Sequence, residues 1–324
     1  METTLTIAIP TYNRAAILSE NLKSFLGKID DKIQVLVSDN FSNDDTEEVC
    51  ISLVKIYPNF KYFKNEKNLG YDANVLNSLL KSNSKYVWFL SDDDFVTPEI
   101  INEIFHYLNG NSPAGILVNA IVKDKDSGSV LIESLGITNK DKKEFCDDNT
   151  FQKYIQWSTL ISSIIIQKQK VDLQIAKNYI GSCFIQLYIF WGSCANEHIY
   201  IYGSKKIVKY DSEKPSFNLS NYEIWFKSWI KVINSFKSIY SVTAIKNAST
   251  GLYVRSRFNQ SGILTYVILC RAYSIISLND LSLIYCSLNL SIYQKIIIFI
   301  VLCIPAQFLL LLINISKKIK LLSR

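Results

Sequence analysis

The stretch that decides the fold is YVWFLSDDD, residues 86–94. It opens with five consecutive apolar residues and closes with three adjacent aspartates, Asp92, Asp93 and Asp94. A nearly continuous apolar run of this length predicts a strand that is buried on both faces, as strands of parallel sheets are. The aspartates then lie at the carboxyl end of that strand, which is the edge where open α/β sheets bind their ligands.

Segments on either side of this stretch alternate between strand and helix patterns. Further strands are predicted at residues 5–10, 33–37 and 60–64, and helices at residues 14–26, after residue 43, at residues 72–80 and from residue 97. This order predicts an α/β fold with an open, mostly parallel sheet that helices flank. We divide the chain into residues 1–112, residues 113–215, which complete the α/β domain, and a helical C-terminal region, residues 216–324.

The composition excludes several classes of protein. The hydrophobic fraction of 48% excludes a disordered chain. The seven cysteines are scattered and never spaced C-x-x-C, so we expect neither a zinc site nor a disulfide framework. The net charge of +6 comes mostly from residues 262–324, which carry six basic side chains and one acidic one. Because this excess accompanies an apolar segment, it favours a membrane surface and no nucleic acid as partner.

The apolar segment, residues 296–313, is interrupted by Pro305 and Gln307. Lys295 precedes it and three lysines follow it. Its length is at the low end for a spanning helix, and both flanks are basic, so the positive-inside rule favours neither side. We expect a proline-kinked, membrane-associating helix that lies on or dips into the cytoplasmic leaflet. The alternative is a buried helix of a soluble domain.

The three aspartates are candidate metal ligands. Carboxylate oxygens suit Mg²⁺ or Mn²⁺, and such sites combine one or two carboxylates with substrate phosphates. Alternate side chains of an extended segment face the same way, so Asp92 and Asp94 are expected to converge on one metal ion while Asp93 points elsewhere. The alternative is a solvated acidic turn before the next helix.

Two further polar clusters end predicted strands of the same sheet. Asp39 ends the second strand, where a carboxylate accepts hydrogen bonds from a nucleobase or from ribose; the alternative is a helix cap. The turn after the first strand can cradle a base, with a guanidinium for a phosphate, although turn chemistry explains it equally well. Its residues are Pro10, Thr11, Tyr12, Asn13 and Arg14.

Four segments resemble, in order and spacing, motifs of the family-2 glycosyltransferases. They are IAIPTYNR (7–14), VSDNFSND (37–44), NLGYDAN (68–74) and FLSDDD (89–94). The resemblance implies the GT-A fold, with residues 1–112 as its nucleotide-sugar half and residues 113–215 as its acceptor half. Within the family the chain looks most like abequosyltransferase-like enzymes of bacterial surface polysaccharides such as O-antigen.

The resemblance also implies an activity and a site. A sugar would pass from a nucleoside-diphosphate sugar to a hydroxyl of a lipid-linked glycan, with Mg²⁺ or Mn²⁺, at the cytoplasmic face of the bacterial inner membrane. Asp92 and Asp94, which match the family's D-x-D motif, would bind the metal, and Asp94 is also the candidate catalytic residue. The donor would be bound by Asp39, by the turn at residues 10–14, and by Asn68, Gly70, Asn74, Asp92 and Asp93.

The chain departs from the family at two places. Ala73 stands where an arginine usually precedes Asn74. Inverting members use a carboxylate base, often in a Glu-Asp pair, but the corresponding window holds Asp172, Glu197 and no such pair. The segment most like that pair, residues 181–186, offers Gln186, which takes no proton at neutral pH.

We therefore name Glu197 as the candidate base, the alternative being an exposed residue at a helix end, and leave open whether transfer inverts or retains the configuration. The missing pair also suggests a second function, a non-catalytic nucleotide-binding subunit of a polysaccharide assembly complex. A sugar-nucleotidyltransferase is disfavoured, because its glycine-rich, basic first loop is absent after Ile9.

Overall fold

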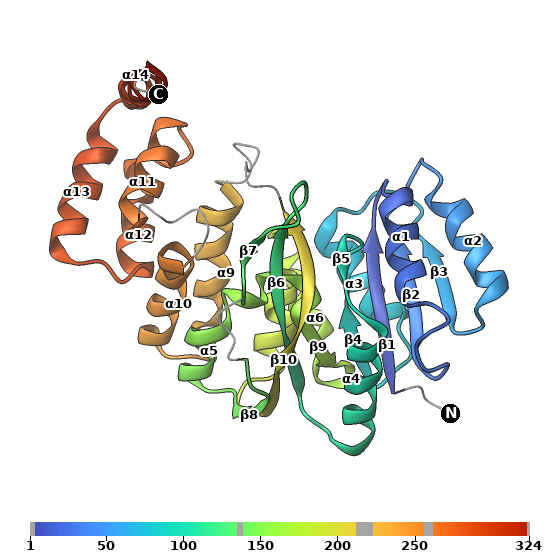
Figure 1. The fold of residues 1–324 in the computed structure, drawn as a ribbon. Coiled ribbons are helices and arrows are strands. Elements are labelled where there is room, and N and C mark those ends of the chain that lie inside the picture. Colours follow the sequence, from blue (N-terminus) through green and yellow to red (C-terminus); the bar gives the residue numbers. More distant parts are fainter. Residues whose placement is uncertain (1–3, 135–138, 212–222, 256–261, 323–324) are drawn as a thin grey trace. The chain divides into compact units, whose positions relative to one another are not determined.

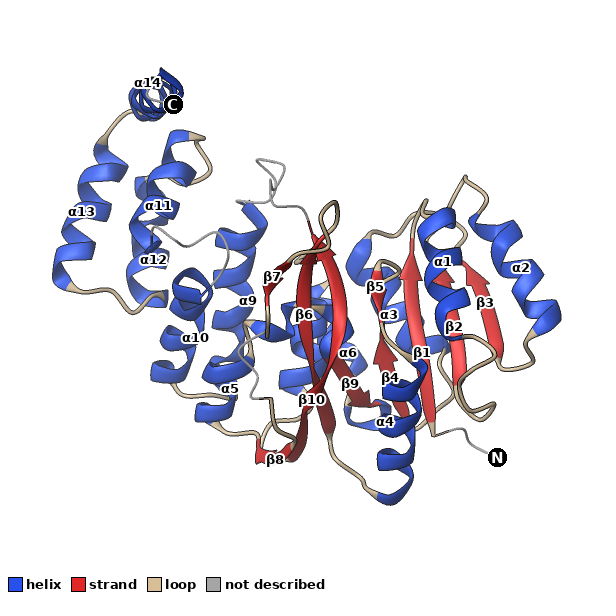
Figure 2. Cartoon of the chain, in the orientation of Figure 1, coloured by secondary structure: helices blue, strands red, loops and turns tan. Residues whose placement is uncertain are grey.

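The computed structural model describes residues 4–134, 139–211, 223–255 and 262–322 of the chain. The chain divides into two compact units, Met1–Pro215 and Ser216–Arg324, each of which is described by itself. The first unit is a mixed α/β fold in which helices flank a large sheet (Figures 1 and 2).

Over the described residues of the first unit, ten strands form one sheet. Eight of them follow the order β3-β2-β1-β4-β9-β6-β10-β5, while β7 pairs with β6 and β8 pairs with β10. The strands are β1 (Leu5–Thr11), β2 (Gln34–Asp39), β3 (Phe60–Lys64), β4 (Tyr86–Phe89), β5 (Asp94–Phe95), β6 (Gly115–Asp124), β7 (Val130–Ile132), β8 (Lys142–Phe145), β9 (Ile164–Gln167) and β10 (His198–Asp211).

The helices of the first unit are longest where they connect the first strands. The α-helices are α1 (Ala15–Phe25), α2 (Thr46–Ile56), α3 (Tyr71–Lys81), α4 (Pro98–Gly110), α5 (Asp148–Tyr154), α6 (Leu173–Ala176) and α7 (Ile185–Leu187). Short 3-10 and π turns are η1 (Trp157–Thr159), η2 (Ile161–Ser163), η3 (Lys168–Lys170), η4 (Lys177–Tyr179) and η5 (Tyr188–Gly192).

The directions of the strands are mixed. Strands β3, β2, β1 and β4 are mutually parallel, as the alternating order of the sequence predicts. Strand β9 runs antiparallel between β4 and β6, and β10 is parallel to β6. Because β9 reverses direction between two neighbours, β6 and β10 run the same way as β1. The carboxyl ends of all these forward strands therefore lie along one edge of the sheet.

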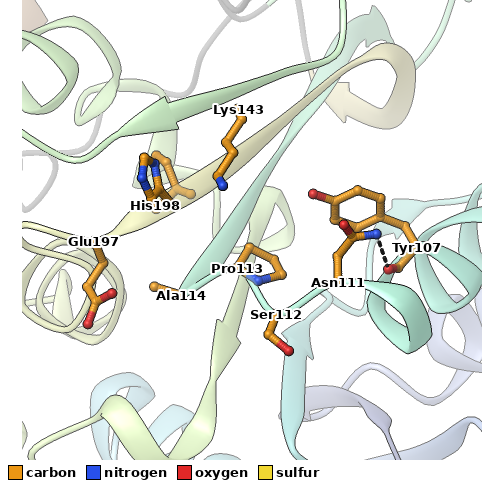
Figure 3. A pocket seen from close by; sticks show the side chains of 9 residues that line it. Tyr107, Asn111, Ser112, Pro113, Ala114, Lys143, Glu197 and His198 are labelled. Atoms are coloured by element: carbon orange, nitrogen blue, oxygen red, sulfur yellow. Dashed lines mark hydrogen bonds between the residues drawn. The ribbon is translucent and has the colours of Figure 1, made fainter.

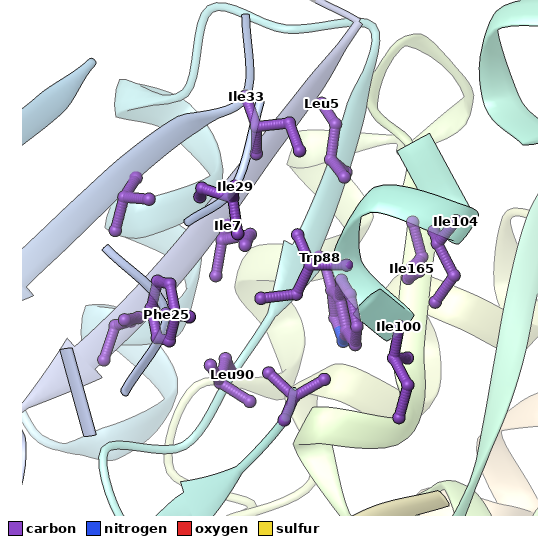
Figure 4. Close-up of a cluster of buried hydrophobic side chains, with 14 of the residues drawn as sticks. Leu5, Ile7, Phe25, Ile29, Ile33, Trp88, Leu90, Ile100, Ile104 and Ile165 are labelled. Carbon is purple, nitrogen blue, oxygen red and sulfur yellow. The ribbon is translucent and has the colours of Figure 1, made fainter. Parts of the chain in front are cut away.

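Apolar side chains of alternating positions build a core on each face of the sheet. Ile7 of β1 and Trp88 of β4 are buried in a cluster with residues of α1 and α4 (Figure 4). Ala8, the next residue of β1, pairs with Phe89 and lies on the opposite face, which α3 covers. Burial on both faces explains why β4 reads as an unbroken apolar run in the sequence.

The order of the strands creates a switch point at β1. From β1 the chain passes through α1 to β2 on one side, and β4 later pairs with β1 on the other side. The connection after β1 runs to one side of the sheet and the connection after β4 runs to the other side, and such a switch point is where open α/β sheets have their ligand-binding crevice. Thr11 ends β1 at this point, and the three aspartates follow β4.

The second unit is helical over its described residues. Its elements are η6 (Glu223–Ser228), α9 (Trp229–Ser235), η7 (Phe236–Ser238), α10 (Val242–Arg255), α11 (Gly262–Ala272), η8 (Leu278–Asp280), α12 (Leu281–Ser287), α13 (Ile292–Cys303) and α14 (Ala306–Leu322). The proline-kinked helix expected over residues 296–313 corresponds to a pair of helices, α13 and α14, bent by 102° at Pro305. Proline disfavours helical geometry in the residue before it, which ends α13. Among the described helices, none taken alone combines the length and the apolar composition of a membrane span.

Gly115 gives a test of this packing at the start of β6. A Cβ atom there would lie 2.7 Å from Cε2 of Phe190 and 2.9 Å from the carbonyl oxygen of Ile165. We predict that Gly115→Ala lowers the free energy of unfolding by about 1–3 kcal/mol in urea denaturation. The matched control is Gly110→Ala, where no atom lies within 4 Å of the added carbon. Equal stability of the two variants would contradict the arrangement of β6, β9 and η5.

Candidate functional site

The site lies where β1 and β4 end. The Thr11 hydroxyl donates a 2.7 Å hydrogen bond to Oδ2 of Asp92, joining the carboxyl ends of the two strands. Asp92 is buried, which raises its pKa, while the bonds from Thr11 and Arg14 act in the opposite direction. Thr11 and Asp92 therefore meet at the switch point, as their positions after parallel strands predict.

Arg14 joins this pair to the next aspartate. One guanidinium nitrogen, Nη1, lies 3.0 Å from Oδ1 of Asp92 and 2.7 Å from Oδ2 of Asp93. The Arg14 side chain is about half exposed, so its remaining N–H groups are accessible from solvent. Burial acts to raise the pKa of Asp93, but the Ser91 hydroxyl, Lys209 and Arg14 together lower it below its ordinary value. Asp93 is thus an ionised carboxylate held by its neighbours.

Asp94 is the most buried of the three aspartates, with no exposed surface. Its Oδ2 accepts a 2.5 Å hydrogen bond from the Ser162 hydroxyl, and its Oδ1 lies 3.9 Å from Nζ of Lys209. Oδ1 accepts no hydrogen bond. Burial raises the pKa of Asp94 to about 6, against the effects of Lys209 and Ser162. The carboxylate therefore has one oxygen that is desolvated and incompletely compensated.

Asn21 fixes the backbone that carries the aspartates. It lies in α1 with no exposed surface, on the same face as Leu18 and Leu22. Its Nδ2 lies 2.9 Å from the carbonyl oxygen of Asp94 and 3.3 Å from those of Ser91 and Asp92. An amide on the apolar face of a predicted helix was the signal in the sequence that would have identified this residue.

Asp39 ends β2 beside the same crevice and is fully buried. Its Oδ1 accepts a hydrogen bond from the Ser42 backbone N–H at 2.9 Å, and its Oδ2 accepts one from the Tyr62 hydroxyl at 2.7 Å. It therefore closes the turn after β2 and does not cap α2, which begins at Thr46. Each carboxylate oxygen retains capacity for a further donor.

The loops after β1 and β2 are tied together next to Asp39. The Asn13 backbone N–H donates to the Ser42 hydroxyl at 2.8 Å, and the Asn13 side chain accepts from the Asn43 backbone at 2.9 Å. Pro10 lies half-buried at the end of β1. Two aromatic rings on these loops stay exposed, Tyr12 at 45% and Phe41 at 49%. The loops thus present two accessible rings close to a buried carboxylate.

Asn68, Gly70 and Asn74 belong to an amide network that connects β2, the loop before α3 and α3 itself. Asn74 donates to the Ser38 carbonyl at 2.9 Å, and the Asn40 side chain donates to Oδ1 of Asn68 at 2.9 Å. Gly70 has a φ of 81°, a backbone conformation that suits glycine. Asn74 is buried in this network, whereas Asn68 and Gly70 lie exposed on the loop before α3.

Asp72, at the start of α3, holds the segment that most resembles the family's acid pair. Its carboxylate accepts backbone N–H groups of Gly181 and Cys183 at 2.8 Å and of Ile185 at 3.2 Å. Gln186 follows, buried, with Nε2 3.2 Å from the carbonyl oxygen of Thr159 and with Oε1 unpaired. Because Thr159 precedes Ser162 by three residues, Gln186 lies towards the edge that holds Asp94.

The structure does not bring Glu197 to this edge. Glu197 precedes β10 and forms an ion pair with Lys170 at 2.5 Å. It lines a cavity of about 220 Å³ with His198, Lys143 and Tyr107 (Figure 3). That cavity lies at the amino ends of β6 and β10, whereas the aspartates lie at the carboxyl edge. The length of β10 separates Glu197 from the cluster, so the position offers no base for a reaction there.

The carboxylates fit a divalent cation only in part. Asp94 supplies a hard oxygen ligand, Oδ1, without a hydrogen-bond partner. Both oxygens of Asp92 are already paired, to Arg14 and Thr11. Across the residues that the structure describes, no three His, Cys, Asp or Glu side chains are grouped to hold a metal ion by themselves. One protein carboxylate with substrate phosphates is a common Mg²⁺ arrangement, so Asp94 suits a cation that arrives with a phosphate ligand.

Ser162 and Lys209 are site residues that the sequence did not reveal. Ser162 donates to Asp94 and accepts the Ser91 backbone N–H at 2.9 Å, and it comes from the turn before β9. Lys209 reaches Asp94 because β10 pairs with β5. Both depend on long-range strand pairing, which leaves no local pattern in the sequence.

The chain is similar to known proteins in sequence and in fold. Residues 6–174 match the family described as Glycosyl transferase family 2. The abequosyltransferase RfbV of Salmonella typhimurium is 28% identical over 261 residues, which cover 72% of this chain and 75% of that protein. The GalNAc(5)-diNAcBac-PP-undecaprenol beta-1,3-glucosyltransferase of Campylobacter jejuni is 28% identical over 144 residues, 42% of this chain and 46% of that protein.

Among solved structures, residues 1–349 of TarS from S. aureus in complex with UDP-GlcNAc share the fold. The TM-score is 0.59 at 15% identity, with 91% of this chain and 88% of that chain covered. The likeness is one of architecture, the GT-A fold of glycosyltransferases.

The raised pKa of Asp94 predicts a pH-dependent cost in stability. Because the folded pKa of about 6 exceeds the ordinary value of 3.8, the buried carboxylate destabilises the fold above pH 6 and ceases to do so as pH falls towards 4. We expect Asp94→Asn to be more stable than the wild type at pH 7.5 by on the order of 2 kcal/mol. The advantage shrinks towards pH 4.5 in parallel urea denaturations. A variant that is less stable at pH 7.5 would contradict this description of Asp94.

Proposed function

The chain belongs to glycosyl transferase family 2, and we propose that it transfers a sugar from a nucleoside-diphosphate sugar to a hydroxyl of a lipid-linked glycan. The reaction would serve bacterial surface polysaccharide synthesis at the cytoplasmic face of the inner membrane. One relative, the Campylobacter enzyme, is named for a substrate of this kind, a glycan linked to undecaprenol through a diphosphate. The observation that carries the proposal is the meeting of Thr11, Arg14 and Asp92 at the switch point, one strand away from Asp39.

The nucleoside would occupy the side of the crevice next to β2. Asp39 can accept a hydrogen bond from a base N–H while it keeps its bonds to Ser42 and Tyr62. The exposed rings of Tyr12 and Phe41 supply stacking surfaces of the kind that bind nucleobases. Pro10 and Asn13 would contribute backbone groups at the same turn. This half of the site recognises base and ribose.

The diphosphate would lie on the side next to β4 and β5. Arg14 offers accessible N–H groups to a phosphate, and Asp94 would hold Mg²⁺ or Mn²⁺ through its unpaired oxygen. When bound, the cation stabilises the negative charge of the departing nucleoside diphosphate as a Lewis acid. Asp92 orients Arg14, and Asn21 fixes the backbone of all three aspartates. The role of Asp94 therefore explains why a destabilising buried carboxylate stands at this position.

The helices α13 and α14 suggest how the chain reaches a lipid-linked acceptor. Each helix exposes large apolar side chains at three- and four-residue spacing, so each presents one apolar stripe. A helix with such a stripe lies in the plane of a membrane interface, and the lysines on either side of residues 296–313 in the sequence favour anionic headgroups. The exposed residues are Ile292, Tyr293, Ile296, Phe299 and Ile300 on α13, and Phe308, Leu311, Leu312 and Ile315 on α14.

Donor turnover tests the activity. UDP-, CDP- and GDP-sugars are incubated with the protein and Mg²⁺ or Mn²⁺, and release of nucleoside diphosphate is measured. We expect one donor to be consumed, and Asp94→Asn to lose at least about a hundredfold of the rate although it folds. The control is Asp45→Asn, an exposed aspartate at the start of α2.

Metal-dependent turnover at the wild-type rate in Asp94→Asn would contradict the proposal. Nucleotide binding without consumption of any donor, even when a lipid-linked acceptor is added, would instead favour the non-catalytic nucleotide-binding subunit.

Vesicle flotation tests the membrane surface. We expect the wild type to float with vesicles that contain phosphatidylglycerol, and less with vesicles of phosphatidylcholine alone. The double variant Phe299→Asp with Leu311→Asp places one charge in each stripe and should reduce the floating fraction about tenfold. Ile56→Asp is the matched control, because Ile56 is 64% exposed on α2. Flotation of the double variant at the wild-type level would refute the assignment of the stripes.

A further inference from the structure

Lys209 is held beside the aspartate cluster by the pairing of β10 with β5. In this antiparallel pair Lys209 lies opposite Asp94, and Val208 lies opposite Phe95. The rings of Phe95 and Tyr210 meet edge to face with centroids 5.6 Å apart, which supports this register. Residues directly opposite in an antiparallel pair project to the same face of the sheet. The pairing of the two strands thus places the Lys209 side chain next to the Asp94 carboxylate.

The contact between the two side chains is loose. Nζ of Lys209 lies 3.9 Å from Oδ1 of Asp94, a distance that compensates charge without a hydrogen bond. Asp94 has no exposed side-chain surface, whereas the Lys209 side chain is 33% exposed. Lys209 also acts on Asp93 electrostatically. The ammonium therefore stands between a buried carboxylate and the solvent of the crevice.

A divalent cation at the unpaired oxygen of Asp94 would compete with the Lys209 ammonium for the same negative charge. Oδ1 is the atom that we assign to the divalent cation, and it is also the atom nearest to the ammonium. Two positive charges on one carboxylate oxygen repel each other, so a divalent cation displaces the lysine. A lysine side chain has a flexible four-carbon stem, so the displaced ammonium can reach another anionic group close by. In a loaded donor site that group is the diphosphate.

We propose that Lys209 is an exchangeable counter-cation of the donor site: it neutralises Asp94 while no metal is bound, and pairs with the donor diphosphate when a divalent cation takes its place. The second half of this statement rests on the proposed function; the first half does not. Lys209 is thereby a binding residue for the diphosphate and a positioning residue for Asp94.

The proposal predicts that removal of the Lys209 charge raises the affinity for Mn²⁺ and lowers the affinity for nucleoside diphosphate. Without the ammonium, Mn²⁺ meets an uncompensated carboxylate, so Lys209→Met should bind Mn²⁺ about tenfold more tightly in the absence of nucleotide. The same variant lacks a cation for the diphosphate, so its affinity for nucleoside diphosphate in EDTA should fall about tenfold. An ion pair that only stabilises the fold would change neither affinity.

The experiment uses the full chain and three variants. Mn²⁺ binding is followed by electron paramagnetic resonance of the free ion at about pH 8, where Asp94 is ionised. Binding of UDP, CDP and GDP is measured by calorimetry, once with EDTA and once with Mn²⁺. Lys209→Arg retains the charge and should stay within about threefold of the wild type in both titrations. Lys205→Met is the control on the same strand, where the lysine pairs with Glu103 at 3.5 Å.

The outcomes separate this inference from the proposed function. If the wild type binds a nucleoside diphosphate with Mn²⁺, and Lys209→Met matches Lys205→Met in both titrations, the role of Lys209 is refuted and the function stands. If no nucleoside diphosphate binds the wild type under either condition, the function fails, and with it the diphosphate contact. Absence of Mn²⁺ binding in both the wild type and Lys209→Met, or weaker Mn²⁺ binding in the variant, overturns the exchange itself.

Discussion

The constraint on which this structure depends is the placement of three consecutive carboxylates at the end of a buried strand. Negative charges so close together are unfavourable in a low-dielectric setting unless cations and hydrogen-bond donors surround them. The fold supplies these groups from four different elements: Arg14 before α1, Thr11 at the end of β1, Ser162 before β9 and Lys209 on β10. Asp94 keeps one oxygen without a hydrogen bond, and burial raises its pKa to about 6.

The surroundings of the cluster are built to be rigid. Hydrogen bonds of the Asn40 and Asn74 amides connect the end of β2 with α3 and the loop before it. The Asp72 carboxylate accepts hydrogen bonds from three backbone N–H groups between Gly181 and Ile185. Such networks hold neighbouring loops at fixed positions, which suits a site that must align a donor and an acceptor. Asn68 and Asn74 make contacts of this supporting kind.

Local patterns in the sequence predict the first half of the fold closely. The strands expected at residues 5–10 and 33–37 are β1 (Leu5–Thr11) and β2 (Gln34–Asp39), because apolar runs and their polar ends are local features. The meeting of Thr11 with Asp92 follows from parallel strand order. Local patterns could not identify Ser162 and Lys209 as site residues. Both reach the site through the antiparallel pairing of β9 with β4 and of β10 with β5, which joins segments far apart in the sequence. The prediction of Glu197 as the base went wrong for the same reason, because the position of Glu197 relative to Asp94 depends on the direction of β10.

The most direct test of the account is a crystal structure of the chain with Mn²⁺ and whichever nucleoside diphosphate binds most tightly. The account requires the base beside Asp39 and Tyr12, and the diphosphate with its cation beside Asp94. A nucleotide seated at the opposite edge of the sheet, in the cavity next to His198, with the aspartates and Arg14 untouched, would contradict it.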